Sequence, residues 1–244
     1  MEKEVFLSVI IPAYNEEHRL GKTLEAVDAY LKQQPFTYEI LAVNDGSTDR
    51  TAEVVREYAR TMQGLSLVDI AQNRGKGYVT QQGMLKAQGK FRLFMDADNA
   101  TSIEHFEKMV PYFTEGFDIV IGSRRTKGAN IAVHQPFYKE FLGLLGNVYI
   151  QVLAVWGVFD TQCGFKAFTS RAAQDIFSRL TIFRWGFDVE VLALGRKLNY
   201  KIKEIPVYWV NDPESRVTLK VYFQVLSETT KIRWNFMTNK YKLK

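Results

Sequence analysis

The sequence predicts an α/β fold in which a mostly parallel sheet is covered by helices on both faces. Short apolar runs rich in β-branched residues alternate with stretches whose apolar residues recur at helical spacing, and the connections between them are short. Strands joined through helices form right-handed βαβ units, which gives parallel pairing. The 244 residues suffice for one core. We therefore expect one domain over residues 1–217, followed by a basic amphipathic helix over residues 218–244.

Each element of the first half has its own local signal. Asn15 is a natural N-cap for the first helix, with two acidic residues in its first turn, and Thr48 is suited to capping the second. The Asp45-Gly46 pair predicts a turn. The expected strands span residues 5–11, 39–43, 65–71, 91–95 and 117–121, and the expected helices span residues 15–31, 47–62, 76–87 and 102–113.

The second half is less regular. Residues 141–159 carry no charge and precede the polar segment DTQCGFKAF at residues 160–168. The apolar spacing predicts helices over residues 170–180 and 187–198, a strand over residues 202–210 and a basic helix from residue 218 onward.

Composition narrows the classes of partner and site. The net charge of +5 suits anionic substrates or an anionic membrane surface, but it is too small to predict nucleic-acid binding. Cys163 is the only cysteine, so no intrachain disulfide can form, and the three scattered histidines do not predict a zinc site. The first residues lack the basic start and long apolar region of a signal peptide, so we expect folded domain from the start of the chain.

The strongest candidate for chemistry is the pair Asp96 and Asp98, directly after the apolar run FRLFM. Two carboxylates two residues apart in an extended segment point to the same side, so they can bind one divalent cation. Such a cation would neutralise the charge that develops on a departing diphosphate. The alternative is a solvated turn at the end of a strand.

Three further loops follow predicted strands, where parallel sheets bind their ligands. Residues 12–16 and 44–49 carry acidic side chains that can accept hydrogen bonds from a ribose hydroxyl or a base N–H. In residues 73–77, glycines allow close approach of the backbone, and Lys76 can reach a phosphate or a ribose. Helix caps, a turn and an ordinary basic loop are the alternative readings of these segments.

The motifs SVIIPAYNEE, VNDGSTD, NRGKG, DADNAT, GSR and DTQCGFKAF, in this order, resemble those of the inverting family-2 glycosyltransferases with the GT-A fold. Within that family, DTQCGFK and RWGFDVE make the chain most similar to dolichyl-phosphate β-glucosyltransferases, with dolichyl-phosphate mannosyltransferases as close relatives. The resemblance covers residues 5–210. Eukaryotic members carry an N-terminal membrane anchor that we do not find in this sequence, so the mode of membrane attachment is open.

The resemblance implies a set of donor-binding residues. Asp96 and Asp98 would serve the sugar nucleotide and its Mg²⁺ or Mn²⁺, with Asp98 the better-supported metal ligand. The residues implied to hold the nucleoside or to lie near the donor are Pro12, Tyr14, Glu16, Asp45 and Lys76.

The resemblance also implies an acceptor side. Gly122, Ser123 and Arg124 would line it, with Arg124 binding the lipid phosphate and Arg125 beside it. Asp160 and Gln162 resemble the acidic motif at the reacting centre, and Asp188 and Glu190 would lie close to that centre.

A phosphate acceptor determines the expected mechanism. Its second pKa lies near ~6, so its oxygen is already ionised at neutral pH and needs no strong base. We expect glucose to move from UDP-glucose to a polyprenyl or dolichyl phosphate with inversion, with Asp98, Arg124 and Asp160 as the catalytic residues. GDP-mannose as donor, a sugar hydroxyl as acceptor with Asp160 or Asp188 as base, and a catalytically silent nucleotide-sugar-binding module are the alternatives.

Two segments are candidates for contact with a membrane. Residues 141–159 are long enough to be considered for a span, although Asn147 and Gln151 favour a helix at the membrane interface or a packing helix. From residue 218 onward, basic residues alternate with Trp, Tyr and Phe, which suits an interfacial helix or an ordinary amphipathic helix packed on the domain. We expect a peripheral protein at the cytoplasmic face of a membrane.

Overall fold

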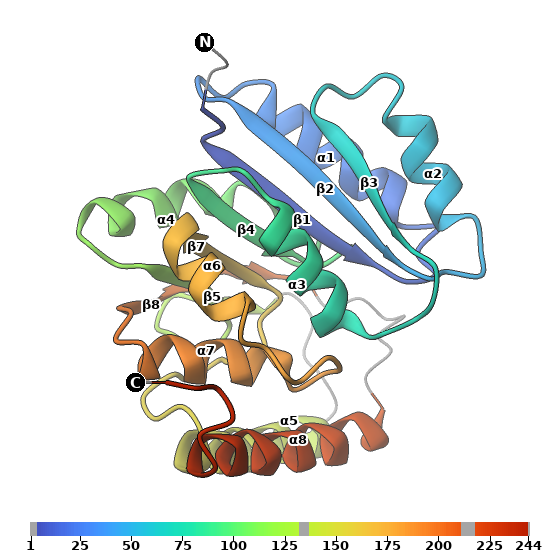
Figure 1. Cartoon of the computed structure of the whole chain (residues 1–244). Helices are drawn as coiled ribbons and strands as arrows, with labels where there is room; N and C mark the ends of the chain where they lie inside the picture. Colours follow the sequence, from blue (N-terminus) through green and yellow to red (C-terminus); the bar gives the residue numbers. More distant parts are fainter. Residues whose placement is uncertain (1–3, 132–136, 211–217, 244) are drawn as a thin grey trace.

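The computed structural model describes residues 4–131, 137–210 and 218–243, which form a seven-stranded sheet with helices on both faces (Figure 1). The strand order is β3-β2-β1-β4-β7-β5-β8. The first half supplies four parallel strands: β1 (Leu7–Ala13), β2 (Tyr38–Asp45), β3 (Leu65–Ile70) and β4 (Phe91–Met95). The α/β class and the parallel first half are as the sequence predicted.

An antiparallel strand interrupts this parallel arrangement. β7 (Phe165–Thr169) lies between β4 and β5 (Ile119–Ser123) and pairs antiparallel with both, and β8 (Ile202–Pro206) then pairs parallel with β5. No strand was predicted at β7. The single strand predicted over residues 202–210 is in fact two strands, because β9 (Tyr208–Trp209) forms a separate two-stranded sheet with β6 (Asn130–Ile131).

The two faces of the sheet bury separate apolar clusters because side chains alternate along a strand. In β1, Ile10 joins the cluster beneath helices α3 (Lys76–Lys86), α6 (Ser170–Phe177) and α7 (Phe187–Lys197). Val9 and Ile11 join the cluster on the opposite face, beneath α1 (Leu20–Leu31), α2 (Thr51–Tyr58) and α4 (His105–Thr114). The strands are therefore buried on both sides, which explains their continuous apolar runs.

Two predicted helix caps were wrong. The Asn15 backbone has φ +52°, and α1 begins only at Leu20, so Asn15 lies in a loop before the helix. α2 begins at Thr51, and the side chain of Asp49 accepts the hydrogen bonds of the Thr51 amide and hydroxyl in place of the expected cap at Thr48.

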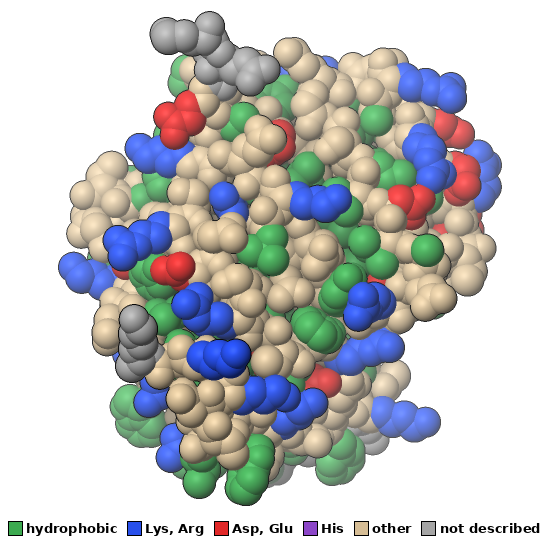
Figure 2. Space-filling model, in the orientation of Figure 1, with side chains coloured by type: hydrophobic (Ala, Val, Ile, Leu, Met, Phe, Trp, Pro, Cys, Tyr) green, Lys and Arg blue, Asp and Glu red, His purple; other side chains and the backbone are tan. Residues whose placement is uncertain are grey.

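A pair of helices closes the molecule at one end. α5 (Phe137–Leu153) and α8 (Leu219–Met237) lie side by side, beyond α7 (Figure 1). Hydrophobic side chains, with Lys and Arg next to them, gather at this end of the surface (Figure 2). No helix among the described residues is long and apolar enough to cross a membrane, so the span considered for residues 141–159 is not found. The division of the chain at residue 217 stays a prediction.

Candidate active site

The predicted site residues come from loops that meet at one edge of the sheet. They follow the carboxyl ends of β1, β2, β3, β4 and β5. Because β7 runs antiparallel, the turn that precedes it reaches the same edge. Residues 160–164 therefore join these five loops, although no helix–strand pattern in the sequence indicated it.

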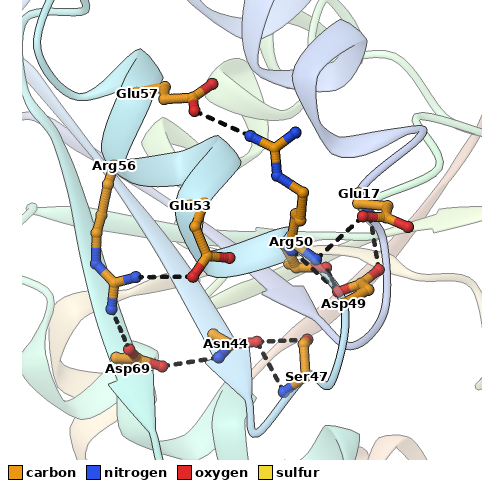
Figure 3. Close-up of polar contacts among 10 residues, drawn as sticks. Glu17, Asn44, Ser47, Asp49, Arg50, Glu53, Arg56, Glu57 and Asp69 are labelled. Atoms are coloured by element: carbon orange, nitrogen blue, oxygen red, sulfur yellow. Dashed lines mark hydrogen bonds and ion pairs between the residues drawn. The ribbon is translucent and has the colours of Figure 1, made fainter.

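The first two loops are cross-linked by short hydrogen bonds. The Asn15 amide donates to Ser47 Oγ over 2.9 Å, and the Thr48 amide donates to Asn15 Oδ1 over 2.9 Å. Figure 3 shows the adjoining contacts, in which the Glu17 amide donates to Asp49 and the Arg50 amide donates back to Glu17. These polar side chains therefore hold the loops after β1 and β2 together.

The three residues expected to hold the nucleoside differ in exposure. Pro12 is buried at the end of β1, whereas the ring of Tyr14 is exposed beyond it. Glu16 is nearly buried and forms a bidentate ion pair with Arg19 at 2.7 and 2.8 Å. Tyr14 can therefore offer a flat surface to a base, while Glu16 also anchors the loop before α1.

Asp45 has a structural role that the sequence did not reveal. Its buried carboxylate accepts hydrogen bonds from the Asn73 side chain, the Arg74 amide and the Gly75 amide, at 2.7 to 2.9 Å. Burial raises the pKa of this carboxyl, and the two amides offset part of that rise. Asp45 thus holds the loop that leads into Lys76.

Lys76 and Asp96 form an ion pair of 2.6 Å between Nζ and Oδ1. Burial lowers the pKa of Lys76, but the carboxylates of Asp96 and Asp188 outweigh it, so the pKa is raised and the ammonium stays charged. The Asp96 amide donates to Gly164 O over 3.1 Å, and a Cβ at Gly164 would overlap the Asp96 carboxylate. Only glycine fits at this point of the turn before β7.

Asp98 presents the second carboxylate of the pair. Its Oδ1 accepts a hydrogen bond of 3.0 Å from the Ala100 amide. Burial and the neighbouring Asp96 raise its pKa. A divalent cation at this position would favour the ionised form and so relieve both effects.

The donor set tests whether a cation fits. Among the described residues, no cluster of three or more His, Cys, Asp or Glu side chains could hold a metal ion. Asp96 and Asp98 can contribute two carboxylates, and the other ligands would be diphosphate oxygens and water. Mg²⁺ is commonly held this way, by one or two carboxylates together with substrate phosphates. The residues fit a metal that arrives with a nucleotide.

Arg124 and Asp160 form an ion pair with three hydrogen bonds. The Arg124 amide and Nε donate to Asp160 Oδ2, and Nη2 donates to Oδ1, each over 2.8 Å. Burial alone would raise the pKa of Asp160, but the Arg124 guanidinium overcomes it and holds the pKa at about 2. A carboxylate with such a pKa is a poor general base near neutral pH.

The Arg124–Asp160 pair is supported from both sides. The Arg124 guanidinium lies 5.2 Å from the centre of the Trp209 ring. The amides of Phe159 and Asp160 donate to Glu204, at 2.9 and 3.0 Å. Trp209 and Glu204 were not among the predicted site residues.

Arg125 and Gln162 are exposed, unlike their neighbours Arg124 and Asp160. The Arg125 guanidinium lies close to α5. A Cβ atom added to Gly143 of that helix would be 3.7 Å from Arg125 Nη2. Arg125 and Gln162 are thus exposed residues next in sequence to, or two residues from, the paired Arg124 and Asp160.

Asp188 is paired with a residue to which the sequence analysis gave no role. Lys166 is fully buried in β7, and its ammonium donates to Asp188 Oδ1 over 2.5 Å and to Cys163 O over 2.6 Å. Burial raises the pKa of Asp188, and Lys166 counters part of that rise. The sequence did offer one signal for this buried pair, namely a lysine inside the apolar run FKAF, because a buried lysine requires a partner.

Glu190 does not share the surroundings of Asp188, and its expected place beside the reacting centre stays a prediction. Its carboxylate accepts hydrogen bonds from the Thr181 and Ile182 amides and, over 2.6 Å, from the Tyr241 hydroxyl. Residues two apart in a helix point in different directions. Glu190 thus ties the C-terminal segment to the loop before α7.

Charge is distributed in a definite way over this edge of the sheet. Asp96 and Asp98 offer acceptors to a cation, while Lys76, Arg124 and Arg125 offer donors to anions. Arginine and lysine at such positions hold phosphate oxygens. The arrangement can bring two anionic substrates together.

Comparison with known proteins agrees with this geometry. The family model described as glycosyl transferase family 2 matches residues 8–177. A dolichyl-phosphate beta-glucosyltransferase of Trichomonas vaginalis is 42% identical and aligns with 84% of this chain and 66% of its own length. The enzymes of that name from Dictyostelium discoideum and Homo sapiens are 36% and 33% identical, align with 98% and 97% of this chain, and are covered over 77% and 78% of their lengths.

Solved structures share the fold at low sequence identity. Glucosyl-3-phosphoglycerate synthase from Mycobacterium tuberculosis, in complex with UDP, has a TM-score of 0.69 at 16% identity, covering 94% of this chain and 80% of that one. TarS of S. aureus, in complex with UDP-GlcNAc, has a TM-score of 0.59 at 20% identity, covering 93% and 66%. These matches show the GT-A architecture. The chain therefore belongs to glycosyl transferase family 2, and within that family it groups with the dolichyl-phosphate beta-glucosyltransferases.

Proposed function

We propose that this glycosyltransferase moves glucose from UDP-glucose to a polyprenyl or dolichyl phosphate, with inversion at the anomeric carbon. The names of the relatives support both the sugar and the acceptor, and UDP in complexes of two structural neighbours supports the base. Because the acceptor is a membrane lipid, the proposal includes peripheral action at the cytoplasmic face of a membrane.

The observation that carries the proposal is the ion pair between Arg124 and Asp160. The carboxylate nearest the expected acceptor side is held by a guanidinium, with a pKa of about 2, and is poorly suited to deprotonate a sugar hydroxyl. Asp188, the other candidate base, is buried and bonded to Lys166. A phosphate monoester is already ionised, so it needs cations rather than a base.

Each group then has a defined task. Asp98, with Asp96, would hold Mg²⁺ or Mn²⁺, which when bound neutralises the charge of the departing diphosphate. Once the Lys76 ammonium separates from Asp96, it can donate a hydrogen bond to the same diphosphate. Arg124 and Arg125 hold the acceptor phosphate, and Asp160 keeps the Arg124 guanidinium in place. Tyr14 and the loop held by Asp45 position the nucleoside.

The test is a matrix of donors and acceptors. UDP-glucose, UDP-N-acetylglucosamine and GDP-mannose are each offered to a polyprenyl phosphate and to the corresponding free polyprenol, with Mn²⁺ or with EDTA. We expect product from UDP-glucose and the phosphate alone, and its loss with EDTA. Transfer to the free alcohol at a comparable rate, or preference for GDP-mannose, would overturn the proposal.

A matched pair of variants assigns the metal. Asp98→Asn should abolish the gain in UDP-glucose affinity that Mn²⁺ provides, measured by calorimetry. Glu57→Gln, at an exposed carboxylate on α2 that pairs with Arg50, should leave that gain intact. Equal effects of the two substitutions would remove Asp98 from the metal site.

A further inference from the structure

The outer face of the α5–α8 helix pair exposes two apolar stripes. On α5, Leu144, Leu145, Val148 and Val152 recur on one side of the helix, and Val152 is 67% exposed. On α8, Phe223, Trp234 and Met237 do the same, with Phe223 72% and Trp234 62% exposed. Large apolar side chains gathered in this way usually mark a surface that binds something.

The two stripes belong to one surface. The Tyr149 hydroxyl, at the edge of the α5 stripe, shares a hydrogen bond of 2.7 Å with Thr230, in the middle of the α8 stripe. The opposite side of α8 is buried: Asn235 donates to Thr181 over 2.9 Å, and Val225 and Ile232 lie in the core. The stripes therefore face away from the domain together, at the end of the molecule seen at the bottom of Figures 1 and 2.

Positive charge surrounds this surface. At 3.6 residues per turn, Lys220 and Lys231 fall on one flank of the α8 stripe and Arg233 on the other, and all three are exposed. Lys240 and Lys242 follow, also exposed. The one acid of α8, Glu228, accepts hydrogen bonds from the Gly186 amide and the Gln224 side chain. The exposed charge of this segment is thus uniformly basic.

We propose that this surface, the α5–α8 platform, binds the face of an anionic lipid bilayer. Tryptophan and tyrosine beside an apolar stripe, with cations on its flanks, match the interface between headgroups and acyl chains. A second copy of the chain fits less well, because pairing the platform with itself would bring the cations of the two copies together. This inference rests on the peripheral membrane action in the proposed function and deepens it by naming the surface that binds the lipid, and it can be tested without any sugar donor.

The platform leads directly to the acceptor side of the site. Trp156 and Phe159, 75% and 52% exposed, connect α5 to Asp160, which holds Arg124. Arg125 lies against α5 at Gly143. Binding of the platform to a bilayer would place these arginines beside the headgroup layer, where a lipid-borne phosphate is found.

The experiment is sedimentation of the full chain with vesicles of phosphatidylcholine, alone or mixed with phosphatidylserine, without donor or acceptor. We expect strong binding to the mixed vesicles only. The double variant F223S/W234S should lower the partition coefficient by about tenfold or more, because two exposed aromatic side chains no longer enter the interface. Unchanged binding by this variant, with a normal melting temperature, would overturn the proposal.

Charge reversal gives a matched control. K220E/K231E, on α8 of the platform, and K22E/R60E, on α1 and just after α2 at the opposite end of the molecule, change the net charge equally. The first variant should lose binding to phosphatidylserine vesicles, and the second should keep most of it. Equal loss by both would show attraction by net charge alone and would contradict a defined platform.

Two further measurements separate the other outcomes. Sedimentation equilibrium without lipid should show a monomer; a dimer that F223S/W234S dissociates would assign the surface to a second copy instead.

A measurement of transfer separates the platform from the proposed function. F223S/W234S should keep its rate of glucosyl transfer with a short, water-soluble prenyl phosphate and lose it with acceptor in vesicles. If transfer fails for every acceptor while vesicle binding persists, the proposed function is wrong and the platform stands.

Discussion

Asp160 shows how a single residue sets the electrostatics of the site. It is 3% exposed, and both of its carboxylate oxygens accept hydrogen bonds from Arg124. The sequence identified the residue through its motif but could not reveal its partner, which lies 36 residues earlier in the chain. Asp160 therefore orients the Arg124 guanidinium.

The depressed pKa of Asp160 predicts acid sensitivity. Because its folded pKa of about 2 lies below the value of 3.8 for a free carboxyl, the ionised form stabilises the fold above about pH 4, and this contribution is lost as pH falls towards 2. The shift corresponds to roughly 2 kcal/mol. Asp160→Asn should lower the free energy of unfolding at pH 7 and flatten its fall between pH 4 and pH 2, as measured by urea titration.

The control is another carboxylate paired with an arginine. Glu57 is exposed and contacts Arg50 at 3.3 Å, so Glu57→Gln should change the free energy of unfolding by less than about 1 kcal/mol. A pH profile for Asp160→Asn that parallels the wild type would contradict the assigned pKa.

At the scale of elements, the NRGKG loop and the segment before α7 pack as one unit. Gly75 has φ +102° and ψ +155°, and a Cβ there would collide with Phe183 O. Arg184 donates to Asn73 over 2.7 Å across the same contact. From the sequence, the glycines of this loop were expected to let the backbone approach a ligand. The structure shows that packing against a segment about 110 residues later also requires them.

Gly75→Ala should therefore both strain the backbone and push the two segments apart. We expect a loss of about 3 kcal/mol in the free energy of unfolding, together with weaker UDP-glucose binding, because Lys76 follows directly. Gly116→Ala is the control: its φ is +85°, but nothing lies within 4 Å of the added Cβ, so only strain of about 1 kcal/mol is expected. Equal losses would show that the contact with Phe183 is unimportant.

The C-terminal segment is attached by a buried polar contact. Tyr241 is nearly buried and donates to Glu190, itself fully buried in α7. Tyr241→Phe removes a hydrogen bond to a carboxylate and should cost about 1.5–3 kcal/mol in unfolding experiments. Tyr208→Phe, at an exposed ring, should cost less than about 0.5 kcal/mol. Comparable costs would mean that the hydroxyl of Tyr241 adds nothing.

At the scale of the whole molecule, the sequence predicted the parallel first half well and the order of the second half poorly. Buried strands such as β1 and β4 can be recognised in the sequence, because each is an apolar run followed by a segment with helical periodicity. β7 does not, because Lys166 interrupts its run, and its position between β4 and β5 depends on contacts distant in sequence. The loop ends of the site were predictable from motifs; the partners of Asp45, Asp160 and Asp188 were not.

Lys166 ties β7 to α7 through its contact with Asp188. Lys166→Met leaves a buried carboxylate without its partner, which should cost about 3–5 kcal/mol at pH 8. The loss should be smaller at pH 5, because an unpaired buried carboxyl is more readily protonated there. Lys166→Met with Asp188→Leu should recover part of the stability at both pH values. Failure of the double variant to recover any would point to shape, not charge, at this position.

The place of β7 has a consequence for synthesis of the chain on the ribosome. β4 is made early, yet the strand that pairs with its free edge comes only after β5, β6 and α5 have been made. Throughout that interval, the hydrogen-bonding groups of an apolar strand lie open to neighbouring nascent chains. Ribosomes stalled before residue 165 should hold a chain that recruits a chaperone such as trigger factor, and release of that factor should coincide with emergence of residues 165–169.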